Sequence, residues 1–245
     1  MARRLGTERV RLDQVDTTMR VAAEHAEAGA PEGFLVVADR QTAGRGRLGR
    51  SWQSDPGVGL YFSLVLRPAL TLARALPLTL ACGLGVARGV GRTCGLQCDI
   101  RWPNDVMIGD HKLAGILVES AAQEDRVRYA VVGVGINVNQ EELPEELAEI
   151  ATSLRIETDK EWARDLLLSA VLDEIERYYD LLLDKGSPGV IEAFTRASSY
   201  VRGKAVVVEG ADRQGVTAGL DPDGMLLLDE DGVIAPVTAG SVRPL

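Results

Sequence analysis

Long apolar runs are missing from this chain of 245 residues. None approaches the roughly 18 residues that a membrane-spanning helix needs. The N-terminus, Met-Ala-Arg-Arg-Leu-Gly-Thr-Glu, has no apolar signal-peptide core behind its arginines. The sequence therefore predicts a cytoplasmic protein with no membrane partner.

Cysteine is also scarce. Cys82, Cys94 and Cys98 are three in number, so they cannot all pair within one chain. Together with His111 they have neither the spacing nor the ligand number of a metal site. We expect reduced, mostly buried thiols and no metal held by protein side chains.

The chain also lacks a net positive charge. The chain has 27 Lys and Arg against 36 Asp and Glu, a formal net charge of -9. Because a general nucleic-acid binder needs a basic face, the sequence predicts no nucleic-acid partner. The apolar share of 46% is ordinary for a core-forming protein. The length allows one sizeable domain with a small appended one.

Residues 41–52 depart from this acidic background with the sequence Gln-Thr-Ala-Gly-Arg-Gly-Arg-Leu-Gly-Arg-Ser-Trp. The glycines let backbone N–H groups approach a ligand. Guanidinium groups beside such N–H groups suit an anion such as a phosphate. Taken alone, the same composition is also typical of a flexible, solvated loop.

Residues 44–49 of this loop match G-x-G-x-x-G, the pattern of dinucleotide-binding folds. In those folds the motif opens a helix. Here it continues into Ser-Trp-Gln-Ser-Asp-Pro-Gly, which cannot begin a helix of any length. The phosphate-loop pattern G-x-x-x-x-G-K-[ST] is also absent. If this loop binds phosphate, we expect it to do so as a mobile loop whose arginines close over the ligand, and not as part of either nucleotide-binding fold.

Helical periodicity predicts three main helices, over residues 13–30, 72–90 and 161–183. Asp16-Thr17-Thr18 resembles a helix cap within the first. Gly186-Ser-Pro-Gly189 separates the third from a shorter helix through Phe194. An acidic, helix-like stretch at residues 141–149 is typical of a solvated face.

Apolar, β-branched runs predict the strands of a mixed sheet at residues 34–38, 60–66, 97–102, 113–119 and 127–138. A hairpin turn is expected at Gly109-Asp110. After Tyr200 four short runs separated by Gly, Asp and Pro predict a small β-barrel that leans on the main domain. The fold class is therefore α+β.

Three further segments attract attention: Arg101-Trp-Pro-Asn-Asp105, Lys112-Leu-Ala-Gly-Ile-Leu-Val-Glu119 and Gly133-Val-Gly-Ile-Asn137. Alone, Pro-Asn-Asp is a turn, and a lysine at a strand end usually faces water. Glycines inside a strand occur where a ligand approaches the backbone.

Together and in this order, the loop and these three segments resemble the motifs of the biotin protein ligases. That family combines a Gly-Arg-Gly-Arg-x-Gly loop, a Lys-Trp-Pro-Asn-Asp segment, a Lys-Leu-x-Gly-Ile-Leu-x-Glu strand and a Gly-x-Gly-Ile-Asn strand. The resemblance runs from Asp16 through the C-terminal barrel. It implies a mixed β-sheet catalytic domain of the biotin/lipoate ligase type over residues 1–200 and a small C-terminal SH3-like β-barrel over residues 201–245.

The resemblance also implies an ATP-dependent ligase. It would activate biotin as biotinyl-5'-AMP and transfer it to a lysine of a biotin carboxyl carrier domain. ATP and biotin would be its substrates, and Mg²⁺ would accompany ATP. Either a monomer or a homodimer is compatible with the family.

The matching positions carry expected roles. The catalytic residues would be Lys112, Arg47 and Asp105. Biotin or its adenylate would contact Thr17, Thr18, Met19, Gln41, Gly44, Arg45, Gly46, Arg47, Lys112 and Gly115. The nucleotide would contact Arg47, Arg50, Trp52, Asn104 and Asn137. Lys112 suits the approach of a carboxylate to a phosphate because that step joins two anions, and Asp105 would orient or deprotonate the acceptor amine.

The sequence departs from the family pattern at three positions. Arg101 stands where lysine is usual, and Thr17 and Met19 replace the more common serine and asparagine. Too few residues precede Asp16 for a winged helix, so we expect a dedicated ligase without operator binding. One alternative is a lipoate or octanoyl transferase, but such enzymes do not usually carry the glycine-arginine loop. The other is a non-catalytic ligand sensor or DNA-binding co-repressor, which the acidic net charge disfavours.

Overall fold

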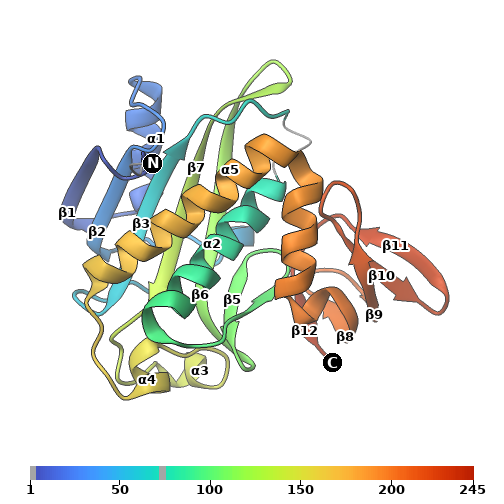
Figure 1. The fold of residues 1–245 in the computed structure, drawn as a ribbon. Helices are drawn as coiled ribbons and strands as arrows, with labels where there is room; N and C mark the ends of the chain where they lie inside the picture. Colours follow the sequence, from blue (N-terminus) through green and yellow to red (C-terminus); the bar gives the residue numbers. More distant parts are fainter. Residues whose placement is uncertain (1–3, 72–75) are drawn as a thin grey trace.

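The computed structural model describes residues 4–71 and 76–245 (Figure 1). A seven-stranded mixed sheet is followed by a five-stranded antiparallel sheet. The order of the first sheet is β1 (Arg9–Val15), β2 (Leu35–Gln41), β3 (Gly59–Leu66), β7 (Arg126–Asn137), β6 (His111–Gln123), β5 (Asp105–Ile108) and β4 (Asp99–Arg101). Among these described strands only β1 and β2 pair in parallel. The expected α+β class is confirmed.

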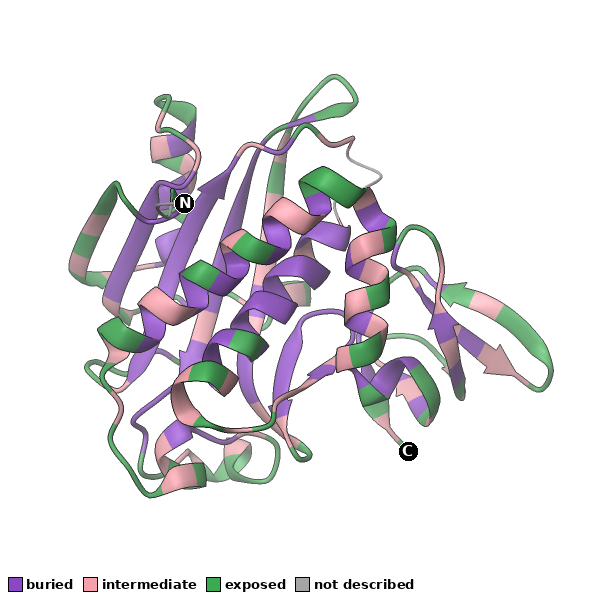
Figure 2. Ribbon diagram, viewed as in Figure 1, coloured by how far each residue is buried: buried purple, intermediate pink, exposed green. Residues whose placement is uncertain are grey.

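The central strand β3 shows why the sheet forms where it does. All eight of its residues are buried, and most are apolar. Because successive side chains of a strand point to opposite faces, Leu64 and Val65 enter different core clusters. Both faces of the sheet are therefore covered, as the buried strands in Figure 2 show.

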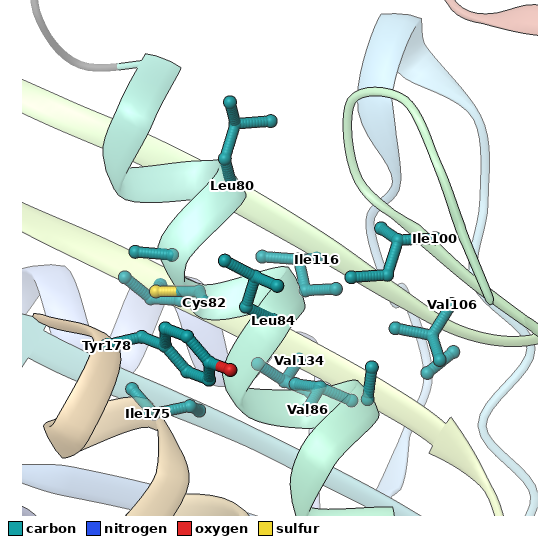
Figure 3. Close-up of a cluster of buried hydrophobic side chains, with 14 of the residues drawn as sticks. Leu80, Cys82, Leu84, Val86, Ile100, Val106, Ile116, Val134, Ile175 and Tyr178 are labelled. Carbon is teal, nitrogen blue, oxygen red and sulfur yellow. The ribbon is translucent and has the colours of Figure 1, made fainter. Parts of the chain in front are cut away.

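Helices α2 (Leu76–Cys94) and α5 (Arg164–Ala197) cover one face of the first sheet (Figure 1). Figure 3 shows Leu84 and Val86 of α2 among Ile116 and Val134 of the sheet. A β-carbon at Gly85 would lie 2.6 Å from the Cα atom of Ile175, so glycine is needed for the close approach of the two helices. The expected helix over residues 72–90 is confirmed from Leu76 onward, and residues 72–75 lie outside the described residues.

Helix α1 (Thr18–Glu27) packs on the opposite face. Thr17 is its N-cap, and the Thr17 hydroxyl accepts a hydrogen bond from the Met19 N–H at 3.3 Å. The predicted cap is confirmed, but the prediction that the helix occupies residues 13–15 is wrong. Those residues end β1, whose largely exposed sequence carries little strand signal and whose partner is the distant β2.

The long helix α5 contains the predicted interruption. Gly186 has φ +65° and ψ -167°, which breaks the helix into two segments, and Pro188 lies two residues further on. The acidic stretch at residues 141–149 forms only one turn, α3 (Glu145–Ala148). Helix α4 (Leu154–Thr158), which periodicity did not indicate, begins where the Ser153 hydroxyl accepts from the Ile156 N–H at 3.1 Å.

The C-terminal sheet has the order β11 (Val233–Val237), β10 (Leu226–Glu230), β9 (Arg213–Leu220), β8 (Arg202–Val208) and β12 (Val242–Pro244). The four predicted strands are confirmed, and β12 was not predicted. Among the strands described, β11 and β12 do not pair, so this barrel stays open. It contacts the main domain as expected: the Trp102 indole N–H, just after β4, donates to the Gly224 carbonyl at 3.0 Å.

Candidate active site

The candidate site lies on the face of the first sheet opposite α2 and α5. Gly115 of β6 and Gly135 of β7 are register partners there. Their neighbours in the strands, Ile116 and Val134, point into the core under α2, so both glycines face away from it. Two adjacent strands thus present bare backbone, which a flat group can approach closely.

The backbone of Gly115 and Gly135 forms a glycine floor, and the indole of Trp52 lies against it. A β-carbon at Gly135 would lie 2.4 Å from Trp52 Cε2, and one at Gly115 would lie 3.0 Å from Trp52 Cζ3. The Trp52 Nε1 atom is buried without a hydrogen-bond partner. Lys112 Nζ lies 5.3 Å from the centroid of the same ring, within reach of a cation–π interaction.

A small cavity of about 50 Å³ remains between the floor and the glycine-arginine loop. Eleven of the predicted site residues line it: Thr17, Thr18, Met19, Gln41, Arg45, Gly46, Arg47, Trp52, Asn104, Lys112 and Gly115. Four do not line it: Gly44, Arg50, Asp105 and Asn137. The fold therefore brings together residues that lie almost 100 positions apart in the sequence.

Polar side chains that line the cavity belong to a continuous hydrogen-bond network. The Thr18 backbone N–H and hydroxyl both donate to Gln41 Oε1, at 2.8 and 3.1 Å. Gln41 Nε2 donates to Ser54 Oγ at 3.0 Å. The hydroxyls of Thr18 and Ser63 are 2.8 Å apart. Gln41 thereby satisfies one of the free N–H groups at the start of α1.

Two half-buried cations, Arg101 and Lys112, flank the buried carboxylate of Asp105. Lys112 Nζ is 2.6 Å from Asp105 Oδ1 without hydrogen-bond geometry, and Arg101 donates to Asp105 Oδ2 at 2.9 Å. Burial alone would raise the pKa of Asp105, but Lys112 and Arg101 outweigh it and hold the pKa below its usual value. Asp105 is therefore an ionised group that anchors two cations.

Arg47 is half-buried and donates to Asn104 Oδ1 at 3.1 Å. Burial lowers the pKa of its guanidinium from the usual value. Asn104 is held in turn by its own amide, which donates to the Ile116 carbonyl at 2.9 Å. The Asn104 side chain thus connects the loop to β6.

The other two loop arginines are tied to different elements. Arg45 pairs with Glu119 of β6 at 2.7 Å, and Arg50 pairs with Glu209, next to β8, at 3.3 Å. Only one 3-10 turn, η1 (Arg47–Gly49), forms within the loop. The G-x-G-x-x-G pattern therefore does not open a helix, as the sequence predicted.

Two predicted site residues lie outside the cavity with structural partners. Asn137 is buried, and its amide donates to the Thr152 carbonyl at 2.9 Å. A β-carbon at Gly44 would lie 2.4 Å from the Trp52 carbonyl oxygen, so glycine lets the two arms of the loop approach each other.

Sequence reasoning missed Ser63, Ser54, Glu119 and Glu209 as members of this region. Ser63 is the one serine in a strand of otherwise apolar and aromatic residues, which is the only signal that pointed to it. The two glutamates are ordinary exposed or half-buried acids, and only the folded chain places them against the loop arginines.

Cys82, Cys94 and Cys98 carry free thiols, and burial raises the pKa of Cys82 to about 12. Within residues 4–71 and 76–245 no group of three His, Cys, Asp or Glu is placed to hold a metal ion. None of the helices described is long and apolar enough to cross a membrane.

A model of the biotin/lipoate A/B protein ligase family matches residues 12–137. Among similar proteins, the bifunctional ligase/repressor BirA of Bacillus subtilis is 36% identical over 98% of this chain and 74% of its own length. The biotin–[acetyl-CoA-carboxylase] ligase of Mycobacterium tuberculosis is 34% identical over 92% of this chain and 84% of its own.

Solved structures agree with the sequence comparisons. The biotin protein ligase of Aquifex aeolicus, in complex with biotin and ATP, superposes with a TM-score of 0.84. It is 34% identical, and the match covers 98% of this chain and 100% of that one. The chain therefore belongs to the biotin/lipoate A/B protein ligase family.

Proposed function

We propose that the chain is a biotin–protein ligase, which converts biotin and MgATP to biotinyl-5'-AMP and passes the biotinyl group to a lysine of a biotin carboxyl carrier domain. One observation carries the proposal most directly. The ammonium of Lys112, held by buried Asp105, lies at the cavity beside the bare backbone of Gly115. The relatives named as biotin ligases support the choice of substrate.

The first half-reaction brings two anions together. A carboxylate oxygen of biotin attacks the α-phosphorus of ATP, the bond from that phosphorus to the bridging oxygen breaks, and pyrophosphate leaves. Lys112 is the fixed cation nearest the glycine floor, and it would offset the charge that accumulates on the carboxylate and the α-phosphate. Arg47 and Arg50 would hold the phosphates, and Asn104 would orient Arg47 through their hydrogen bond.

The second half-reaction breaks the mixed anhydride. The acceptor lysine nitrogen attacks the acyl carbon, the carbon–oxygen bond to phosphate breaks, AMP leaves and the proton released from the amine passes to water. The lowered pKa of Asp105 makes this carboxylate a weak base. We therefore assign Asp105 the role of positioning Lys112 rather than that of accepting the proton.

The remaining ligand contacts are assigned mainly to residues that line the cavity. Thr17, Thr18, Met19, Gln41, Arg45 and Gly46 would surround biotin together with Gly115, and Gly44 would shape the loop that covers it. Trp52 and Asn137 are assigned to the nucleotide side. Because the adenylate is a reactive anhydride, a closed loop would protect it from water. We also propose residues 1–200 as the catalytic domain and residues 201–245 as the appended one.

The decisive experiment incubates the protein with biotin, MgATP and a purified carrier domain, and follows the carrier by mass spectrometry. We expect the gain of one biotinyl group on one lysine and no comparable gain with lipoate in place of biotin. No gain with biotin, or an equal gain with lipoate, would overturn the proposal in favour of no ligase activity or of a lipoate transferase.

Cellular context completes the proposal. We place the reaction in the cytoplasm and propose that the protein has no nucleic-acid partner. The proposed reaction is compatible with a monomer or a homodimer. Since some relatives are named ligase/repressors, a gel-shift assay with biotin, MgATP and random-sequence as well as promoter DNA tests this point. A biotin-dependent shift at a specific DNA site would contradict it.

A further inference from the structure

We propose that Ser63 is a positioning residue for ligand recognition, because it fixes the hydroxyl of Thr18 as a hydrogen-bond acceptor toward the cavity. Ser63 lies in the middle of β3 and is 0% exposed. It does not line the cavity, so it would not touch a ligand itself. Its hydroxyl oxygen lies 2.8 Å from Thr18 Oγ1.

The orientation of the Gln41 amide follows from the Thr18 backbone. A backbone N–H only donates, so the Gln41 atom 2.8 Å from the Thr18 nitrogen must be the oxygen. Gln41 Nε2 is then on the other side, where one of its two N–H groups donates to Ser54 Oγ at 3.0 Å. Its second N–H group has no partner among the described residues and belongs to a side chain that lines the cavity.

The direction of the Ser63 hydrogen bond follows from a proton count at Thr18. The Thr18 hydroxyl carries one proton, and the Gln41 oxygen 3.1 Å away only accepts, so that proton goes to Gln41. The contact between the Thr18 and Ser63 hydroxyls therefore needs the proton of Ser63. A hydroxyl oxygen accepts two hydrogen bonds. After the one from Ser63, Thr18 Oγ1 keeps one lone pair for a group in the cavity.

The wall of the cavity thus offers an acceptor, Thr18 Oγ1, beside a donor, Gln41 Nε2. This pair is complementary to a ligand N–H next to a C=O group, as in a cyclic urea. The ring of biotin contains a cyclic urea, whereas the dithiolane ring of lipoate has neither group. The inference rests on the proposed function and adds to it a physical reason for selecting one acid over the other.

A purely structural role for Ser63 makes a different prediction. A buried hydroxyl needs some partner, and Thr18 supplies one whatever binds in the cavity. In that case loss of the hydroxyl would lower stability without changing affinity for biotin. If Ser63 acts through Thr18, its loss weakens biotin binding only while Thr18 keeps its own hydroxyl.

A double-mutant cycle on the full chain separates these cases, with dissociation constants for biotin and for MgATP measured by calorimetry. We expect Ser63→Ala to weaken biotin binding by about tenfold, the effect of one neutral hydrogen bond, and to leave MgATP binding unchanged. In a Thr18→Val background, Ser63→Ala should weaken biotin binding no further. Ser187→Ala, which removes a buried serine of α5, is the matched control and should leave both constants unchanged.

Unchanged biotin affinity in Ser63→Ala, or losses that simply add in the double variant, would overturn the inference. If Ser63→Ala does not fold, Ser63→Cys keeps the side-chain shape with a slightly larger atom and a weaker donor, and should show a smaller loss that also vanishes in Thr18→Val. Failure of the wild-type protein to bind biotin would instead overturn the proposed function, so the two failures are distinguishable.

Discussion

The indole of Trp52 and the backbone of Gly135 are in such close contact that a β-carbon at residue 135 would lie 2.4 Å from Trp52 Cε2. The register partner Gly115 completes the floor under the ring. This contact joins the glycine-arginine loop to the central sheet. It also leaves a cavity of only about 50 Å³, whereas pockets for small molecules typically measure about 300–1,000 Å³. Ligand binding therefore requires the indole and the loop to move.

Gly135→Ala should disturb this contact more than the fold. We expect biotin binding to weaken at least about tenfold, equivalent to about 1.4 kcal/mol, because the new methyl group covers the bare backbone that a ligand would approach once the indole has moved. Calorimetry measures the affinity, and thermal unfolding reports on the fold. Gly83→Ala is the control, since its β-carbon would meet nothing closer than 3.8 Å. Wild-type affinity in Gly135→Ala would show that the floor has no part in binding.

Lys112→Ala should abolish adenylate formation while the native fold is retained. Loss of a fixed charge that stabilises a transition state costs on the order of 10²–10³ in rate. Asp105 keeps Arg101 as a partner, so we expect only a moderate loss of stability. Pyrophosphate release in the absence of the carrier domain measures this step alone. Lys185→Ala, a substitution on distant α5, serves as control, and near-normal release by Lys112→Ala would refute the role given to Lys112.

Local signals in the sequence predicted most elements correctly. The N-cap at Thr17, the buried strand around residues 60–66 and the break at Gly186 each depend on neighbours within a few residues. The edge strand β1 was missed because its side chains are largely exposed and its pairing partner is distant. Sequence periodicity does not indicate which distant strand an exposed segment will pair with.

Eleven of the residues that line the candidate cavity were predicted from the sequence, but their arrangement was not. Motif order indicated Lys112, Asp105 and the loop arginines, whereas nothing local indicated that Asp105 anchors both Lys112 and Arg101. Ser63 shows the same limit, since its partner Thr18 lies 45 positions away. Such contacts arise only when the strands pair.

Asp105→Asn should change how stability depends on pH. The folded pKa of Asp105 lies below its unfolded value of about 4, so its ionisation stabilises the protein above that pH, and the effect is lost as pH falls through the folded pKa. We expect the variant to be less stable by about 2 kcal/mol at pH 7. Urea unfolding should show this difference shrinking below pH about 4. A difference that stays constant from pH 7 to pH 3 would mean that Asp105 is not the ionised anchor.

Arg47→Ala should shorten the lifetime of the bound adenylate. Arg47 connects the loop to Asn104, and it is the loop arginine that reaches into the half-buried region beside Asp105. Hydrogen bonds to charged groups contribute about 1.5–3 kcal/mol, so release or hydrolysis of the adenylate should become about tenfold to a hundredfold faster. The measurement forms the adenylate from labelled biotin, removes ATP and follows label leaving the protein without a carrier domain. Arg213→Ala, which breaks an ion pair with Glu230 in the C-terminal sheet, should leave the lifetime unchanged. An unchanged lifetime in Arg47→Ala would mean that water is excluded by the floor and Trp52 rather than by the arginine side of the loop.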